Sequence, residues 1–187
     1  MTIKDWIEVA HQNAVDKGFW ESDRSDGEVV ALLHSELSEC LEAMRLNPKN
    51  ATEVQDQKDK IGEELADYFI RLADYCGKKE IDLEKELCGF NDIPINITFL
   101  MDNSDNLRRL FHYKPDDEKD LLAFAHMQLS MFYSCNVVYM HKQYDGLALS
   151  LFAVILLAER LEIDLEKAIA EKMKRNQSRP RLHNKKF

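Results

Sequence analysis

The chain has 187 residues, the size of one domain or two small ones, and 45% of them are hydrophobic, which is enough for a substantial core. Only 6 Gly and 4 Pro are present, which argues against an all-β or a disordered chain. The formal net charge of −9 argues against a protein that coats nucleic acid.

Helical periodicity dominates the sequence, and no segment shows the alternation that is typical of strands. We therefore predict an all-α protein. Helices are expected over residues 2–17, 26–45, 52–76, a short segment from 82, 95–112, 116–141, 145–161 and 164–177. The expected N-caps are Thr2, Ser25 or Asp26, and Asp82, and the expected stops are Gly18, Asn47-Pro48 and Gly77.

Two features predict a cytoplasmic location. No run approaches the roughly 18–20 apolar residues of a membrane span, and residues 1–5 lack the basic and apolar regions of a signal peptide. The cysteines, Cys40, Cys76, Cys88 and Cys135, are scattered without a CxxC pair. They are expected to be reduced and mostly buried thiols, rather than a zinc site or a disulfide frame.

The second half of the chain repeats features of the first. The segment "EIDLEKEL" at residues 80–87 recurs as "EIDLEKAI" at 162–169, and "HSELSE" at 34–39 aligns with "HMQLSM" at 126–131. Two anchors in the same order favour an ancient duplication over chance agreement between amphipathic helices. We predict two tandem units, residues 1–90 and 91–187, that pack as an intramolecular pseudo-dimer.

Four carboxylates occupy unusual positions on two consecutive helices. Glu36 falls within an apolar arc and Glu39 at its edge, while Glu64 borders a second arc and Asp67 follows one turn later. The i, i+3 spacing places each pair on one face, and antiparallel packing across a short loop would bring the pairs together. A lone ExxE is usually a solvated face, but two such pairs favour a common site.

Such a cluster needs a cation, because four close anions cannot all stay ionised. Carboxylate oxygens are the ligands that Mg²⁺ prefers, and Mn²⁺ is an alternative. A di-iron bundle would need ExxH motifs, and neither pair continues into one. The second unit has lost the acids: its aligned positions hold Gln128, Met131, Gly146 and Leu149.

The end of the chain is strongly basic and has no acid after residue 171. Its basic residues are Lys172, Lys174, Arg175, Arg179, Arg181, Lys185 and Lys186. This segment is either a solvated tail that complements a helix dipole or a phosphate-binding arm. Lys172 and Asn176 align with Phe90 and Pro94 of the first unit, so each unit supplies what the other lacks. This complementarity favours one composite site.

The segments "HSELSECLEAMR", "GEELADYFIRLADY" and "EKMKRNQSRPRLHNKKF" resemble the MazG family of all-α nucleoside triphosphate pyrophosphohydrolases. The resemblance covers residues 1–87 and roughly 145–187. It implies that Glu36, Glu39, Glu64 and Asp67 bind Mg²⁺ and that a triphosphate is cleaved between its α- and β-phosphates. By analogy Glu39 would orient the attacking water, and Lys172, Asn176 and Arg179 would hold the phosphates.

The segment "AHQNAVDKGFW" resembles the part of related dCTP-preferring enzymes that forms the nucleotide pocket, which implies a substrate-binding role for His11 and Trp20. The alternatives are a solvated position for His11 and a cap over the helix bundle for Trp20. His34 and His126 are expected in the core or at an interface. Most relatives are short chains that form dimers or tetramers, whereas this chain would be a monomeric pseudo-dimer or a homodimer.

The leading hypothesis is therefore a Mg²⁺-dependent nucleoside triphosphate pyrophosphohydrolase that yields a monophosphate and pyrophosphate. The alternatives are a nucleotide-sensing module that does not hydrolyse and a purely structural helical bundle. The sequence leaves the base and sugar open: dUTP, dCTP and damaged nucleotides, whose removal would sanitise the nucleotide pool, are all compatible with it.

Overall fold

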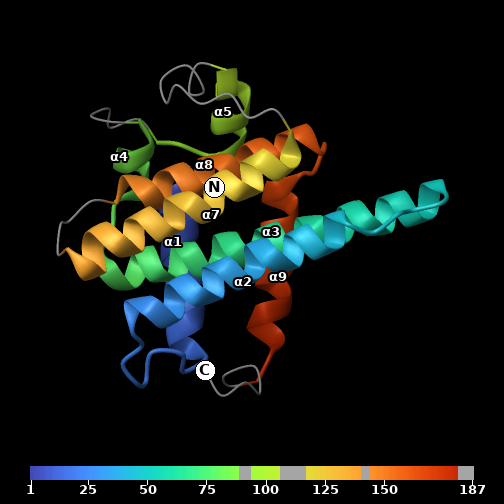
Figure 1. The fold of residues 1–187 in the computed structure, drawn as a ribbon. Helices are drawn as coiled ribbons and strands as arrows, with labels where there is room; N and C mark the ends of the chain where they lie inside the picture. Colours follow the sequence, from blue (N-terminus) through green and yellow to red (C-terminus); the bar gives the residue numbers. More distant parts are fainter. Residues whose placement is uncertain (89–93, 106–116, 140–143, 181–187) are drawn as a thin grey trace.

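The computed structural model describes residues 1–88, 94–105, 117–139 and 144–180, and the regular structure in these ranges is entirely helical (Figure 1). The all-α prediction is confirmed. The helices are α1 (Ile3–Asp16), α2 (Asp26–Met44), α3 (Ala51–Lys79), α4 (Leu83–Cys88), α5 (Ile97–Asp102), α7 (Glu118–Tyr133), α8 (Asp145–Arg160) and α9 (Leu165–Ser178), with a π-helical turn η1 (Ser134–Val138). Among these helices, none combines the length and the apolar character that a membrane crossing requires.

Three of the sequence predictions lie outside the described residues. These are the boundary between the two predicted units at residues 90 and 91, residues 106–112 of the helix expected at 95–112, and the end of the basic tail from Arg181 onward. The expectation of one continuous helix over 95–112 is wrong, because α5 ends at Asp102.

Local cap chemistry begins the first two helices where the sequence predicts. The Thr2 hydroxyl accepts a hydrogen bond from the Asp5 N–H at 3.0 Å, and the Asp5 carboxylate accepts one from the Thr2 N–H at 2.9 Å. This reciprocal pair is a capping box. At α2 the cap is Ser25, whose hydroxyl accepts from the Glu28 N–H, so Asp26 is the first helical residue.

The predicted end of α3 at Gly77 is wrong, because the helix continues to Lys79 and ends at Glu80, whose φ of 55° is left-handed. Gly77 serves the packing of α1 instead. A Cβ atom at this position would lie 2.5 Å from the Cβ of His11, which is far too close. The glycine therefore permits a close approach of two helices rather than a turn.

The helix expected at 116–141 is also shorter, since α7 ends at Tyr133 and the π-helical turn follows.

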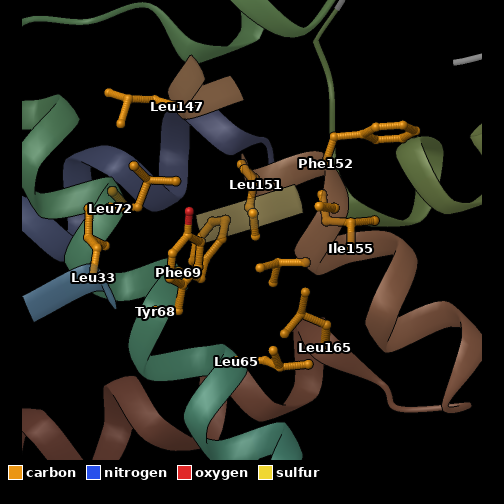
Figure 2. Close-up of a cluster of buried hydrophobic side chains, with 14 of the residues drawn as sticks. Leu33, Leu65, Tyr68, Phe69, Leu72, Leu147, Leu151, Phe152, Ile155 and Leu165 are labelled. Atoms are coloured by element: carbon orange, nitrogen blue, oxygen red, sulfur yellow. The ribbon is translucent and has the colours of Figure 1, made fainter. Parts of the chain in front are cut away.

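The long helix α3 is the centre of the molecule and packs against α1, α2, α8 and α9 (Figure 1). Its buried side chains Leu65, Tyr68, Phe69 and Leu72 meet those of α8 and the start of α9 (Figure 2). Helix α7 covers α8 and contacts α2. The end of α2 and the start of α3 extend beyond the other helices as a hairpin. This arrangement leaves the opposite face of α3 to α1, α2 and α9.

Candidate functional site

Three of the four predicted carboxylates meet between α2 and α3. Glu36, Glu64 and Asp67 each offer an oxygen atom, and these atoms lie within 4.8 Å of one another. Glu36 is buried with 5% exposure, and the other two are half-buried. Glu39 is exposed one turn along α2 and accepts a hydrogen bond from the Ser35 hydroxyl at 3.0 Å. The fourth carboxylate therefore borders the cluster.

Two cations pair with members of the cluster. The Arg71 Nε lies 2.5 Å from Glu36, and the Lys172 Nζ of α9 lies 2.5 Å from Asp67 and 2.7 Å from Glu63. Lys172 is only 4% exposed, so its charge is held inside the molecule by these two partners. The predicted meeting of Lys172 with the carboxylates is observed. Arg71 and Glu63 were not predicted, although Arg71 follows Asp67 by one helical turn.

Glu64 forms no ion pair with a described residue, and its pKa is raised as a result. Burial, together with the neighbouring charges of Glu39, Asp67 and Glu36, raises the pKa of Glu64 to about 7. Burial also raises the pKa of Glu36, although Arg71 opposes this. At neutral pH the cluster therefore holds either a proton or a cation.

The cluster has the donor chemistry of a divalent-cation site. Mg²⁺ holds its oxygen ligands at roughly 2.1 Å, so two ligands on opposite sides lie about 4.2 Å apart. Oxygens within 4.8 Å of one another need only small side-chain rotations to reach this spacing. Each carboxylate has a second oxygen, so an ion pair with Arg71 or Lys172 does not prevent a ligand role. The residues fit Mg²⁺ or Mn²⁺.

A cavity of about 200 Å³ adjoins the carboxylates. Its walls come from α1, the segment before α2, α2, α3 and the end of α9. One end is polar and is lined by Ser35, Glu36, Glu39, Asp67, Arg71, Asn176 and Arg179. The other end is mainly apolar, with Ala10, Ala14, Phe19, Val29 and Ile70 around Asp74. The cavity therefore has one end suited to charge and another suited to a ring.

The end of α9 brings an unpaired amide to this cavity. Asn176 is 5% exposed, and its Oδ1 has no hydrogen-bond partner among the described residues. This oxygen is an acceptor and is closed to solvent, so a phosphate in the cavity would be bound through the Nδ2 group of the same amide. Arg179 also lines the cavity. Lys17, which directly follows α1, fixes this end by donating to the backbone carbonyls of Gln177 and Arg179, both at 2.7 Å.

His11 and Trp20 lie beside the cavity rather than in its wall. The His11 Nδ1 lies 2.8 Å from the Asp74 Oδ1, and the Trp20 Nε1 donates to the same oxygen at 2.7 Å. Their common partner, Asp74, is the residue that lines the cavity. Sequence reasoning missed Asp74, although it follows Asp67 by seven residues and so lies on the same face of α3.

Comparisons with models of protein families, with curated proteins and with solved structures each found no match.

Two further histidines and two cysteines of the described residues take structural positions. His34 of α2 and His126 of α7 stack across the interface of their helices, with ring centroids 5.0 Å apart. This confirms the interface prediction. Cys40 and Cys76 are buried free thiols, and burial raises the pKa of Cys40 to about 12. Neither thiol is therefore suited to act as a nucleophile.

Proposed function

We propose that the chain is a Mg²⁺-dependent pyrophosphohydrolase of (deoxy)nucleoside triphosphates. The observation that carries the proposal is the meeting of three carboxylates with a buried lysine beside a cavity that Asn176 also lines. Carboxylates hold a hard cation, whereas the ammonium group of a lysine and the NH₂ group of an amide donate hydrogen bonds to phosphate oxygens. A triphosphate with its metal needs both kinds of group in one place.

The roles follow from position. Glu36, Glu64 and Asp67 would hold the metal ion, which would supply a positive charge that stabilises the phosphate oxygens in the transition state. Glu39 is free to accept a proton from water, because it lies at the exposed edge of the cluster. Water would attack the α-phosphorus, the bond to the bridging oxygen would break, and pyrophosphate would leave.

The end of α9 would hold the leaving group. Lys172 already faces the carboxylates from α9, and a bound metal would compete for Asp67 and free the ammonium to contact phosphate. Asn176 and Arg179 line the same end of the cavity. Negative charge grows on pyrophosphate as it leaves, and preorganised donors stabilise that charge.

We propose further that residues 1–90 and 91–187 are duplicated units, and two contacts support this. The Nδ1 atoms of His34 and His126 lie 2.7 Å apart, and the hydroxyls of Tyr68 and Ser150 lie 2.6 Å apart. Both pairs occupy aligned positions of the two repeats. In a two-fold arrangement, residues on the axis contact their own equivalents, so both contacts fit an intramolecular pseudo-dimer.

The two "EIDLEK" segments share a backbone conformation, which also supports duplication. Glu80 and Glu162 have left-handed φ values of 55° and 56°. The N–H of the next residue, Ile81 or Ile163, then bonds to the carbonyl five residues before it, at 2.9 Å and 2.8 Å. The shared sequence therefore ends α3 and α8 in the same way.

Between α7 and α8, the positions aligned with the carboxylates are closely packed. A Cβ atom at Gly146, which aligns with Glu64, would lie 2.8 Å from the backbone oxygen of Gln128 and 3.0 Å from the Cβ of Phe132. Helices α7 and α8 are in close contact where α2 and α3 carry carboxylates. The proposed site is therefore a single composite one, built from the carboxylates of α2 and α3 and the end of α9.

A screen for pyrophosphate release over common and modified triphosphates, with Mg²⁺ or Mn²⁺, tests the function. We expect release by the wild type, and loss of release in Glu36→Gln and Asp67→Asn with helical content unchanged by circular dichroism. Glu42→Gln is the matched control, because Glu42 is an exposed residue of α2. Absence of release from every triphosphate would refute the proposal. Thermal stabilisation by Mg²⁺ plus nucleotide would then distinguish a nucleotide sensor from a purely structural protein.

A further inference from the structure

Asp74 is a buried carboxylate at the end of the cavity away from the metal ligands. It is 9% exposed and lies two helical turns beyond Asp67 on α3, which is about 10 Å along the helix axis. A nucleotide places its base and its phosphates at opposite ends of its sugar. With the phosphates at Asp67, the base would therefore extend toward Asp74.

One oxygen of Asp74 is fully used and the other is available. Oδ1 accepts from both the His11 Nδ1 and the Trp20 Nε1, which uses its two lone pairs and fixes the plane of the carboxylate. No described residue donates a hydrogen bond to Oδ2. This oxygen is not closed to solvent, so a ligand or water can reach it. Asp74 lines the cavity and its Oδ1 is bonded to His11 and Trp20, so we take Oδ2 as the oxygen offered to a ligand there.

The surroundings of Asp74 suit a flat heteroaromatic ring. Phe19, Val29 and Ile70 form apolar walls beside it. Arg24 also lines this end, but its Nε pairs with Glu28 at 2.7 Å. The cavity, at about 200 Å³, is smaller than the roughly 300–1,000 Å³ of most small-molecule pockets. It can enclose a base, while the sugar and phosphates extend along the polar end.

We infer that Asp74 selects the base, by accepting a hydrogen bond from an exocyclic amino group through Oδ2. The inference rests on the proposed function for the identity of the ligand as a nucleotide. A base with an amino group, such as cytosine, supplies the donor that this carboxylate lacks. Uracil presents a carbonyl oxygen at the same corner, which the carboxylate repels. Sites built to bond a polar group discriminate strongly, because the wrong ligand leaves buried groups unpaired.

His11 and Trp20 are then positioning residues that hold Asp74, rather than groups that touch the base. His11 and Trp20, the two residues singled out in the "AHQNAVDKGFW" segment, thus act through one shared acceptor, Asp74. It also explains why Trp20, which lies outside the cavity wall, donates its indole N–H to a residue in that wall.

The test compares dCTP with dUTP, which match in size and differ at the amino-bearing corner. The wild type should show a higher kcat/KM for dCTP by about 10-fold or more. In Asp74→Asn, the side-chain oxygen would still accept from His11 and Trp20, so the amide NH₂ would face the cavity. We expect kcat/KM for dCTP to fall about 10- to 100-fold and the preference to move toward dUTP. Asp59→Asn, an exposed change on the same helix, should leave the ratio unchanged.

A second variant and a second measurement keep the outcomes distinct. Trp20→Phe keeps the carboxylate and should keep the preference for dCTP, with a lower kcat/KM. Thermal shifts with dCMP and dUMP, without metal, report the base alone and do not require hydrolysis. An unchanged dCTP to dUTP ratio in Asp74→Asn overturns the inference while the proposed function stands. If no triphosphate is hydrolysed, the proposed function fails. Equal thermal shifts with dCMP and dUMP would overturn the role of Asp74 as well.

Discussion

Replacing Glu64 by glutamine should stabilise the metal-free protein and remove its response to Mg²⁺. Glu64 is half-buried beside three other carboxylates, and no described residue donates to it. Its pKa rises from the ordinary value of 4.5 to about 7. The folded protein therefore binds a proton more tightly at this site than the unfolded chain does. The stabilisation is complete below pH 4.5 and is lost as the pH rises through about 7.

The magnitude follows from the shift. A change of this size in a fully buried group would correspond to about 3 kcal/mol, since each pKa unit is about 1.4 kcal/mol. Glu64 is partly exposed, and solvent screening reduces the effect to about 1 kcal/mol. For a chain of this length, that amounts to a change of about 2–4 °C in Tm. Glutamine has the same shape without the charge, so it removes the penalty at high pH.

The assay is thermal unfolding in EDTA at pH 5.5 and pH 8. When the pH is raised from 5.5 to 8, the Tm of the wild type should decrease more than the Tm of Glu64→Gln. At pH 8 the variant should be the more stable protein. Added Mg²⁺ should then raise the Tm of the wild type alone. The exposed Glu42→Gln controls for a general change of charge on the surface. If Glu64→Gln is no more stable than the wild type at pH 8 in EDTA, the raised pKa assigned to Glu64 is wrong.

Three further changes test the packing around the site. Lys172→Met should lower the free energy of unfolding by about 3 kcal/mol in urea titrations, because it leaves two carboxylates without their buried cation. Gly77→Ala should cost about 1–3 kcal/mol in the same titrations, because its Cβ would collide with that of His11. Asn176→Ala should change stability by less than about 1 kcal/mol, since its Oδ1 has no partner to lose, but should slow pyrophosphate release about 10-fold.

The features that local chemistry determines could be predicted from the sequence. Thr2 and Ser25 cap helices because their hydroxyls reach backbone N–H groups within the next turn. The carboxylate cluster could be predicted because i, i+3 spacing and a short loop leave two helices few ways to pack. Both predictions require only neighbours in the sequence or one antiparallel hairpin.

The features that depend on a third helix could not be predicted in this way. Gly77 reads as a helix stop, but the side chain that decides its role belongs to α1, more than sixty residues earlier. The placement of His11 and Trp20 likewise depends on Asp74, a partner that nothing in the "AHQNAVDKGFW" segment identifies. Contacts of this kind appear only when several helices are assembled.

The polar stripe of α3 lies between these two cases. Glu64, Asp67, Arg71 and Asp74 follow one another at intervals of three and four residues, so they share one face of the helix. The core residues of α3 share a different face, turned toward α8 (Figure 2). Contact with solvent would explain a polar stripe of exposed side chains. It does not explain this one, because Asp74 is only 9% exposed. Extending the carboxylate pair by this spacing would have predicted Arg71 and Asp74, and with them both ends of the cavity. The helix that forms the core therefore also fixes the distance between the proposed metal ligands and the proposed base-selecting residue.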